Sequence, residues 1–198
     1  EIALSQSRSQ QELEEVLYSN LEEFSRMSRM VSDMLFLAQA DNNQLIPEQR
    51  ELDLAEEVHK VFEFFEAWAE EKAVALRFVG SPCRVTGDPL MLRRAISNLL
   101  SNAIRYTPAG QAVTIALSES AETVRLVVEN PGTPIAAEHL PRLFDRFYRV
   151  DPSRQRKGEG SGIGLAIVKS IVSAHHGSVA AQSDLRSTRF IVVLPKQV

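Results

Sequence analysis

The sequence predicts an α+β fold, a two-layer sandwich of helices against a mostly antiparallel sheet, preceded by one long helix. Residues 11–40 contain no proline or glycine and are apolar at threes and fours, the period of an amphipathic helix. Beyond them the pattern runs helix, strand, helix, paired strands, long loop, helix, strands. That order favours separate helices on a sheet over a doubly wound parallel sheet.

The composition is that of one globular domain with a small appendage. The 198 residues are 44% hydrophobic, enough for one substantial core but not for two full-sized domains. The net charge of −4 supplies no cationic surface for a nucleic-acid backbone, so nucleic acid is not an expected partner. Cys83 is the single cysteine, which suits a reducing compartment. No run approaches about 20 apolar residues, so the chain is expected to be soluble and cytosolic. It opens without an initiator methionine, as though cut from inside a helix, so it is expected to be a piece of a longer protein.

The first helix is expected to need a partner. At about 1.5 Å per residue it would be roughly 45 Å long, too long to cover its apolar stripe with the few residues before it. The partner is most simply the same helix of a second copy. The polar, proline-ended stretch 41–47 is expected to be a linker. The stripe consists of Leu13, Val16, Leu17, Leu21, Phe24, Met27, Val31, Met34 and Leu35.

The second unit begins near Leu52 and is expected to supply the sandwich. One apolar face marks a helix from Leu54 onward, and a short strand is expected over 75–79. Asp88 and Pro89 supply an N-cap and a first-turn proline for the next helix. The remaining elements are expected to be a hairpin at 113–117 and 124–128, a loop-rich stretch at 131–160, a helix at 163–175 closed by Gly177, and a strand at 190–194.

Two asparagines lie one turn apart on the helix that Asp88 opens. The four-residue step puts Asn98 and Asn102 on one helical face, where both amides can meet a common polar ligand. Asparagine is costly among apolar neighbours unless a group outside the helix satisfies it. Carboxamide oxygens suit Mg²⁺, which takes few protein oxygens beside phosphates and waters. For the pair taken alone, two surface amides are the alternative.

A glycine-rich run leads directly into the helix at 163–175. It reads Gly158-Glu159-Gly160-Ser161-Gly162-Ile163-Gly164-Leu165. Glycines let backbone N–H groups approach an anion closely, and a helix N-terminus adds partial positive charge, so polyphosphate is the natural ligand. The run is neither a Walker loop nor a Rossmann motif, because no Gly-Lys-Ser/Thr follows and no βαβ unit contains it. A flexible loop is the alternative.

Two further segments complete a candidate site. Residues 144–149 carry aromatic side chains that can anchor the segment to the core, and Arg149 can neutralise a terminal phosphate. A solvated basic loop is the alternative, since Arg154, Arg156 and Lys157 follow. Residues 129–135 lie at a strand end, where ligand loops commonly begin, and the Asn130 amide can read a purine edge.

These segments resemble the sequence boxes of the bacterial sensor histidine kinases, in family order and at family-like separations. The N box corresponds to residues 98–102, the G1 box to 129–135, the F box to 144–149 and the G2 box to 158–165. The resemblance implies the Bergerat (GHKL) ATP-binding fold for a catalytic domain over residues 47–198. It also implies that residues 1–46 are the remnant of a dimerisation and histidine-phosphotransfer hairpin, with residues 1–8 as the tail of its first helix. Residues 45–47 and 130–134 look most like the copper- and silver-responsive kinases of heavy-metal efflux systems.

The resemblance implies roles for individual residues and partners. Asn102 is expected to hold Mg²⁺, Asn98 and Arg105 to flank the phosphates of ATP, Tyr106 to lie against the nucleotide, and Arg149 to reach the γ-phosphate. The other expected contacts are Asn130, Gly132, Ile135, Phe144, Phe147, Lys157, Gly160, Ser161, Gly162, Ile163, Gly164, Leu165 and Thr188. The implied partners are a second copy, through the N-terminal helices, and a response regulator. The parent protein is expected to be anchored in the bacterial inner membrane, with this part in the cytoplasm.

Three positions depart from the family pattern. Asn130 replaces the aspartate usual at the adenine-reading position, and its amide oxygen accepts the adenine amino proton without a charge, so retained but weaker binding is expected. Pro134 and Ser187 replace glycines and stiffen the backbone. None of the four histidines stands in a segment like the family's acceptor sequence, so structural roles are expected for His59, His139, His175 and His176. The chain is therefore expected to bind ATP without phosphorylating itself.

The favoured function is protein-histidine kinase activity, with relay to a response-regulator aspartate. An ATP-driven conformational clamp, as in chaperones, mismatch-repair factors and type II topoisomerases, shares the asparagine and glycine signals but lacks segment 144–149 and the preceding dimer helix. A Cu(I)-binding module is suggested by Met27, Met30 and Met34, because thioethers suit Cu(I). The alternative is that these methionines pack at a helix interface, because a spacing of three and four residues also places side chains on one packing face of a helix.

Overall fold

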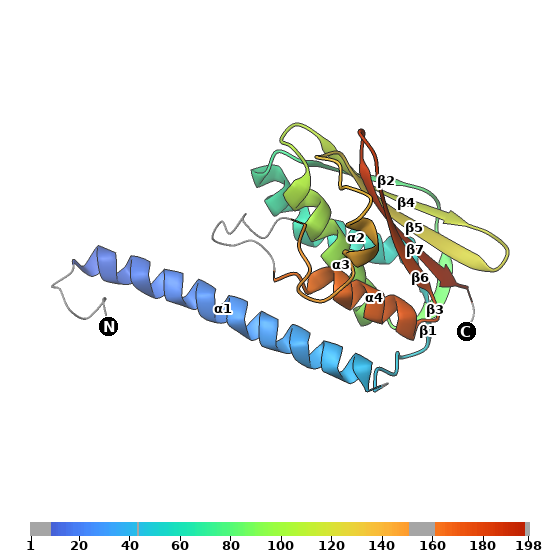
Figure 1. The fold of residues 1–198 in the computed structure, drawn as a ribbon, viewed down its shortest axis with the longest axis horizontal. Coiled ribbons are helices and arrows are strands. Elements are labelled where there is room, and N and C mark those ends of the chain that lie inside the picture. The colour runs from blue at the N-terminus through green and yellow to red at the C-terminus, as the bar shows by residue number, and fades with distance from the viewer. Residues whose placement is uncertain (1–8, 43, 151–160, 197–198) are drawn as a thin grey trace.

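The computed structural model describes residues 9–42, 44–150 and 161–196. A five-stranded sheet in the order β2-β4-β5-β7-β6 has one parallel pair, β2 with β4, and three antiparallel pairs. Helices α2, α3 and α4 lie on one side of this sheet (Figure 1), so the two-layer sandwich is confirmed. The element bounds are α1 Gln10–Asp41, β1 Arg50–Asp53, α2 Leu54–Glu71, β2 Ala75–Val79, β3 Arg84–Gly87, α3 Pro89–Tyr106, β4 Ala112–Glu119, β5 Thr123–Asn130, η2 Leu140–Arg142, α4 Gly164–Ala174, β6 Ser178–Ser183 and β7 Thr188–Pro195.

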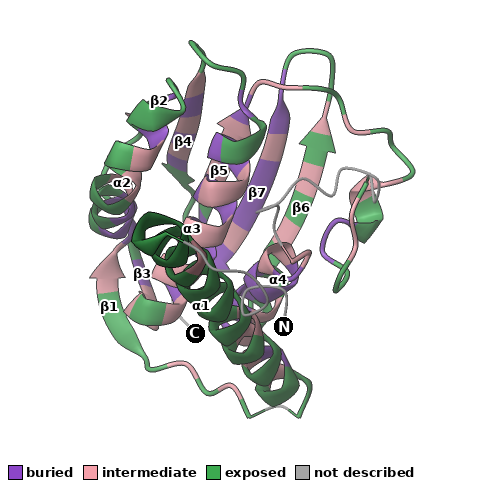
Figure 2. Cartoon of the chain, turned by 90° about the vertical axis from the view of Figure 1, so that its left-hand side faces the viewer, coloured by how far each residue is buried: buried purple, intermediate pink, exposed green. Residues whose placement is uncertain are grey.

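α1 is the predicted long helix, and it extends well beyond the globular part (Figure 1). It begins at a capping box in which the Ser9 hydroxyl accepts from the Glu12 N–H and the Glu12 carboxylate accepts from the Ser9 N–H. Most of its surface is exposed (Figure 2), including the apolar side chains Leu13, Leu17, Tyr18, Leu21, Phe24, Met27, Val31, Met34 and Leu35. Within the described residues no helix is long and apolar enough to span a bilayer.

Only the last turns of α1 contact the globular part. Leu37 is the one residue of α1 that is buried. The Arg94 guanidinium lies 4.3 Å from the centroid of the Phe36 ring and forms an ion pair with Asp33 at 2.5 Å. These contacts join α1 to α3 and leave the predicted apolar stripe uncovered within the described chain.

The strands and helices form where apolar residues recur in the sequence at the period of a strand or of a helix. Asp53 caps α2 by accepting from the Ala55 N–H, and Asp88 caps α3 by accepting from the N–H groups of Leu90 and Met91. The core holds the inward residues of β4, β5 and β7 and the inner faces of the three helices (Figure 2). A second, two-stranded sheet of β1 and β3 was not predicted, because each strand has four residues and β1 has charged residues at three of its four positions.

The end of α4 differs from the prediction. Gly177 does not supply the left-handed residue; His176 does, with φ 56°. The Gly177 N–H donates to the Val172 carbonyl at 2.9 Å and the His176 N–H donates to Ser173 at 3.0 Å, which together form a Schellman motif. Glycine is needed at 177 for a different reason, because a Cβ there would lie 2.5 Å from the Val193 carbonyl oxygen.

His175 joins the end of α4 to the start of α3. Its Nε2 accepts from the Asp88 N–H at 2.9 Å, and its Nδ1 lies 2.8 Å from the Ile171 carbonyl oxygen. A backbone N–H only donates and a carbonyl only accepts, so these two bonds require a neutral imidazole with its proton on Nδ1. Burial lowers the pKa of His175. Its role is structural: as a neutral imidazole it joins the two helix ends by hydrogen bonds.

We expect the protein to become less stable as the pH falls below about 6.5, the ordinary pKa of histidine. The unfolded chain takes up the His175 proton before the folded chain does, so stability is retained above pH 6.5 and is lost between that value and the lower folded pKa. Urea unfolding at pH 7.5 and pH 5.5 measures the loss. His175→Gln keeps an acceptor that does not titrate, and an equal pH effect in that variant would refute the assignment.

Candidate functional site

The asparagine face of α3 lies against the start of α4. A Cβ on Gly164 would lie 3.3 Å from Asn98 Oδ1, so the two residues touch. Asn98 Nδ2 is buried and has no hydrogen-bond partner among the described residues. Asn102 follows one turn later on α3 and is half-buried. The structure thus brings together the two features that the sequence predicts to meet, and it leaves a buried donor without a hydrogen-bond partner among the described residues.

The described part of the glycine run has the features of an anion site. Ile163 stands at the N-cap of α4 without a side-chain cap, so the first N–H groups of the helix have no such partner. Ile163 is itself buried and anchors the turn. Ser161 and Leu165 on either side are half-buried. Lys157, Gly158, Glu159 and Gly160, with Arg154 and Arg156, lie outside the described residues.

Gly162 joins this run to segment 144–149. It has φ +72°, and a Cβ would lie 3.0 Å from backbone atoms of Phe147. The Phe147 N–H donates to the Gly162 carbonyl at 2.9 Å, and Phe147 has φ 60°. Segment 144–149 therefore borders the N-terminus of α4 through its backbone.

The aromatic anchors of segment 144–149 lie near its two ends. Phe144 is buried and meets the Phe190 ring edge to face, with centroids 6.3 Å apart. Phe147 is not an anchor, because 56% of it is exposed. Tyr148 takes that place: it is half-buried, and its hydroxyl lies 2.6 Å from His139 Nδ1.

The arginines of the segment also divide in a way that was not predicted. Arg146 is exposed, and it forms an ion pair with Asp41, at the end of α1, which lowers the pKa of that carboxyl. Its guanidinium also donates to the Leu37 carbonyl at 3.5 Å. Arg149 is half-buried at the end of the described segment.

The purine side of the predicted site lies where β5 meets β7 and α3. Asn130 is buried at the end of β5, directly opposite Thr188 on β7. Its Nδ2 donates to the Pro131 carbonyl at 3.1 Å. A Cβ on Gly132 would lie 2.9 Å from the Tyr106 carbonyl oxygen, so this loop touches the end of α3.

The two other departures from the family pattern have local explanations in the structure. The Ser187 hydroxyl donates to Glu129, which holds the turn before β7. Ser183, which the sequence did not single out, ties the G1 loop to β6 because its hydroxyl accepts from the Ile135 N–H at 3.0 Å and lies 2.8 Å from the Thr188 hydroxyl. Pro134 is exposed.

A family model described as histidine kinase-, DNA gyrase B- and HSP90-like ATPase matches residues 87–198. The chain belongs to this ATPase family. The prediction of an ATP-binding catalytic domain of a sensor histidine kinase, with the GHKL fold, is confirmed. All the described site segments from the N box onward fall within the matched range of the ATPase.

Relatives of this ATPase are bacterial sensor kinases. The chain is 73% identical over 195 residues to the sensor histidine kinase CusS of Escherichia coli K12, covering 98% of this chain and 41% of that protein. It is 66% identical over 200 residues to the probable sensor kinase SilS of Salmonella typhimurium, covering 99% and 40%. The chain thus spans about two fifths of the length of these relatives.

Solved structures share the arrangement. The histidine kinase AdeS of Acinetobacter baumannii has a TM-score of 0.82 at 23% identity, covering 98% of this chain and 89% of that one. A mycobacterial sensor histidine kinase, MprB, has a TM-score of 0.67 at 27% identity, covering 76% and 99%. The match to AdeS extends over α1, and it shows a shared fold.

The side chains of the ATPase site fit a nucleotide triphosphate with Mg²⁺. The unpartnered Asn98 Nδ2 and the N-terminus of α4, which has no side-chain cap, are donors, which suit phosphate oxygens. The Asn102 amide oxygen is a hard ligand of the kind that Mg²⁺ takes in small number. Arg105 and Tyr106 are exposed at the end of α3, beside the G1 loop.

A cleft among the described residues of the ATPase is a separate feature. It measures about 780 Å³ and lies between the end of α1, the linker and the face of α4 that carries Lys169 and Ser173. Phe144 is the one residue of the predicted site that lines it.

Proposed function

We propose that this domain binds Mg·ATP and transfers the γ-phosphate to a histidine imidazole of a sensor kinase, in copper- or silver-responsive signalling. The supporting observation is the contact between Asn98 and Gly164, which places the amide face of α3 beside the donors at the start of α4. The names of the relatives, CusS and SilS among them, support the assignment to heavy-metal sensing.

The proposed chemistry is positioning and charge neutralisation. Asn102 holds Mg²⁺, which supplies charge stabilisation to the phosphate oxygens when bound. Asn98 and the first N–H groups of α4 donate to the phosphates, with Arg105 flanking them. Arg149 meets the γ-phosphate, whose charge spreads over its three oxygens as the bond to ADP breaks and the bond to the imidazole nitrogen forms.

The purine end of the proposed site uses β5 and β7. The Asn130 amide oxygen accepts from the adenine amino group, and Thr188 stands opposite it across the strand pair. Tyr106, Gly132 and Ile135 border the base. Because Asn130 carries no charge, adenine is held by a neutral hydrogen bond, which is weaker than one to a carboxylate.

We also propose the division of the chain and its partners. Residues 47–198 form the ATP-binding domain, and residues 1–46 belong to a dimerisation and phosphotransfer helical domain. The exposed apolar stripe of α1 supports a homodimer through these helices, because apolar patches of this length are commonly covered. A response regulator receives the phosphoryl group, and the parent protein is anchored in the inner membrane. A solved complex of the histidine kinase ThkA with the response regulator TrrA shows such a partner for that relative.

Labelling with γ-³²P-ATP tests the proposal. A form of the protein extended N-terminally, to include a helix with an acceptor histidine, should become labelled, and the label should be lost in acid, as a phosphoramidate is. The present chain should bind ATP yet remain unlabelled, since none of its four histidines has an acceptor context. Steady ATP hydrolysis by the present chain, with no label on the extended form, would instead favour the ATP-driven clamp.

A further inference from the structure

Tyr148 lies in the sequence between two residues of the proposed site, Phe147 and Arg149. The residue before it, Phe147, is fixed by its backbone contact with Gly162. The residue after it is Arg149, which the proposed function assigns to the γ-phosphate. Whatever holds the Tyr148 side chain therefore sets the direction in which the backbone presents Arg149.

Two side chains hold Tyr148. The phenolic hydroxyl lies 2.6 Å from His139 Nδ1, at hydrogen-bond distance. The Arg142 guanidinium lies 4.3 Å from the centroid of the Tyr148 ring, a cation–π contact. The Arg142 contact restrains the ring, and the hydrogen bond to His139 fixes the position of the hydroxyl.

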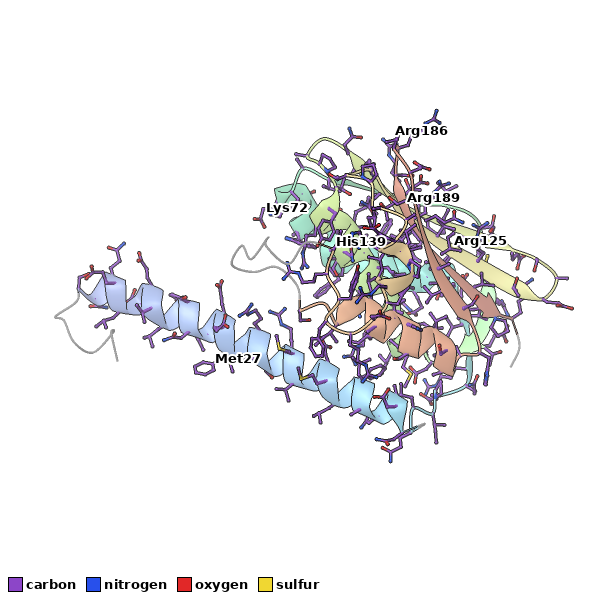
Figure 3. All side chains as sticks on the ribbon, viewed as in Figure 1. Met27, Lys72, Arg125, His139, Arg186 and Arg189 are labelled. Atoms are coloured by element: carbon purple, nitrogen blue, oxygen red, sulfur yellow. The ribbon has the colours of Figure 1, made fainter. Side chains whose placement is uncertain are left out.

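His139 can fix the Tyr148 hydroxyl because its own backbone is restrained by two hydrogen bonds. Its N–H donates to the Ala136 carbonyl at 2.9 Å, and its carbonyl accepts from the Arg142 N–H at 3.0 Å. It immediately precedes η2, which contacts β6 at the edge of the sheet. Figure 3 labels His139 within the globular part of the protein, far from Met27 on α1.

The hydrogen bond also orients the imidazole. Nε2 lies 3.8 Å from a Glu138 carboxylate oxygen, which favours a proton on Nε2 and leaves Nδ1 as the acceptor of the Tyr148 O–H. The Glu138 side chain is 80% exposed, so it contributes orientation and little energy. The His139 side chain is 28% exposed, so its bond to Tyr148 is partly buried.

We propose that His139 is a positioning residue for phosphoryl transfer: through its hydrogen bond to Tyr148 it directs Arg149 toward the terminal phosphate of ATP. This inference rests on the proposed function, because His139 can have a positioning role only if Arg149 binds the terminal phosphate. His139 itself touches no nucleotide. Its effect is confined to interactions that ATP makes and ADP does not.

The ratio of ATP affinity to ADP affinity is the measurement that isolates this effect. A general loss of folding or of the base pocket changes both affinities alike, whereas a misdirected Arg149 weakens ATP alone. Isothermal titration of the present chain with Mg·ATP and with Mg·ADP gives both constants. Arg149→Ala sets the reference and should lower the ratio by about 10-fold, the size of a lost charge-assisted bond.

His139→Ala and Tyr148→Phe should each lower the ratio by about 3- to 10-fold, a part of the Arg149 effect. The double variant should lose no more than either single one, because both remove the same bond. His139→Asn places a polar atom near the position of Nδ1 and should recover most of the ratio. His176→Asn, at an exposed histidine with φ 56° that asparagine also adopts, should leave it unchanged.

Two results would overturn the inference, and they are distinguishable. If Arg149→Ala lowers the ratio and His139→Ala and Tyr148→Phe do not, the proposed function stands and the positioning role is wrong. If Arg149→Ala itself leaves the ratio unchanged, the γ-phosphate role of Arg149 fails, and the role of His139 fails with it.

Discussion

Replacing Asn102 with alanine is expected to weaken ATP binding in the presence of Mg²⁺ by about 10- to 100-fold, the size of a lost contact to a charged group. The substitution removes the one amide oxygen that the proposed site offers to the metal on this turn of α3, while the backbone of the helix stays in place. Without Mg²⁺ the same variant should bind ATP almost as the unaltered chain does. Nucleotide titration with and without the ion measures both effects.

A matched control is available in Asn42→Ala. Asn42 caps the C-terminal end of α1, where its amide donates to the Ala38 carbonyl at 2.9 Å, so the same chemical change is made at a helix end outside the proposed site. The control should leave ATP binding unchanged in either condition. Equal ATP affinity of the Asn102→Ala variant and the unaltered chain in Mg²⁺ would remove the metal role from Asn102.

Gly177→Ala is expected to lower the free energy of unfolding by about 2–4 kcal/mol, because it forces atoms into a filled space. The new Cβ would lie 2.5 Å from the Val193 carbonyl oxygen and 3.0 Å from a Val172 methyl carbon, so α4 and β7 would have to separate. Urea unfolding at one fixed pH measures the change.

Gly110→Ala separates this steric cost from backbone strain. Gly110 has φ +81°, but a Cβ there would meet nothing within 4 Å, so the variant should lose only the strain of the left-handed region, about 1 kcal/mol. Similar losses in the two variants would show that α4 and β7 are not in close contact at this turn.

The long and strongly patterned elements could be predicted from the sequence because their signals are local. α1 follows from a continuous apolar period, and α3 follows from Asp88, Pro89 and the apolar residues after them. The site was predictable for a related reason: a four-residue step fixes Asn98 and Asn102 on one face, and the glycine run precedes a helix. Their convergence depends only on α3 packing against α4.

The remaining contacts depend on residues far apart in the chain and leave no local signal. β1 pairs with β3 across more than thirty positions, from Asp53 to Arg84 among others, and neither strand has a marked period. Arg146 meets Asp41 across 105 positions. Which aromatic side chains of segment 144–149 are buried also depends on such a contact, because the tight backbone approach to Gly162 turns Phe147 outward, whereas Phe144 and Tyr148 pack inward.

The uncovered stripe on α1 makes protein concentration a variable in every equilibrium measurement on this chain. If a second copy covers the stripe, the dimer is favoured by mass action, and the midpoint of unfolding rises as the solution becomes more concentrated. Thermodynamic values for variants are therefore comparable only when every sample contains the same molar amount of chain.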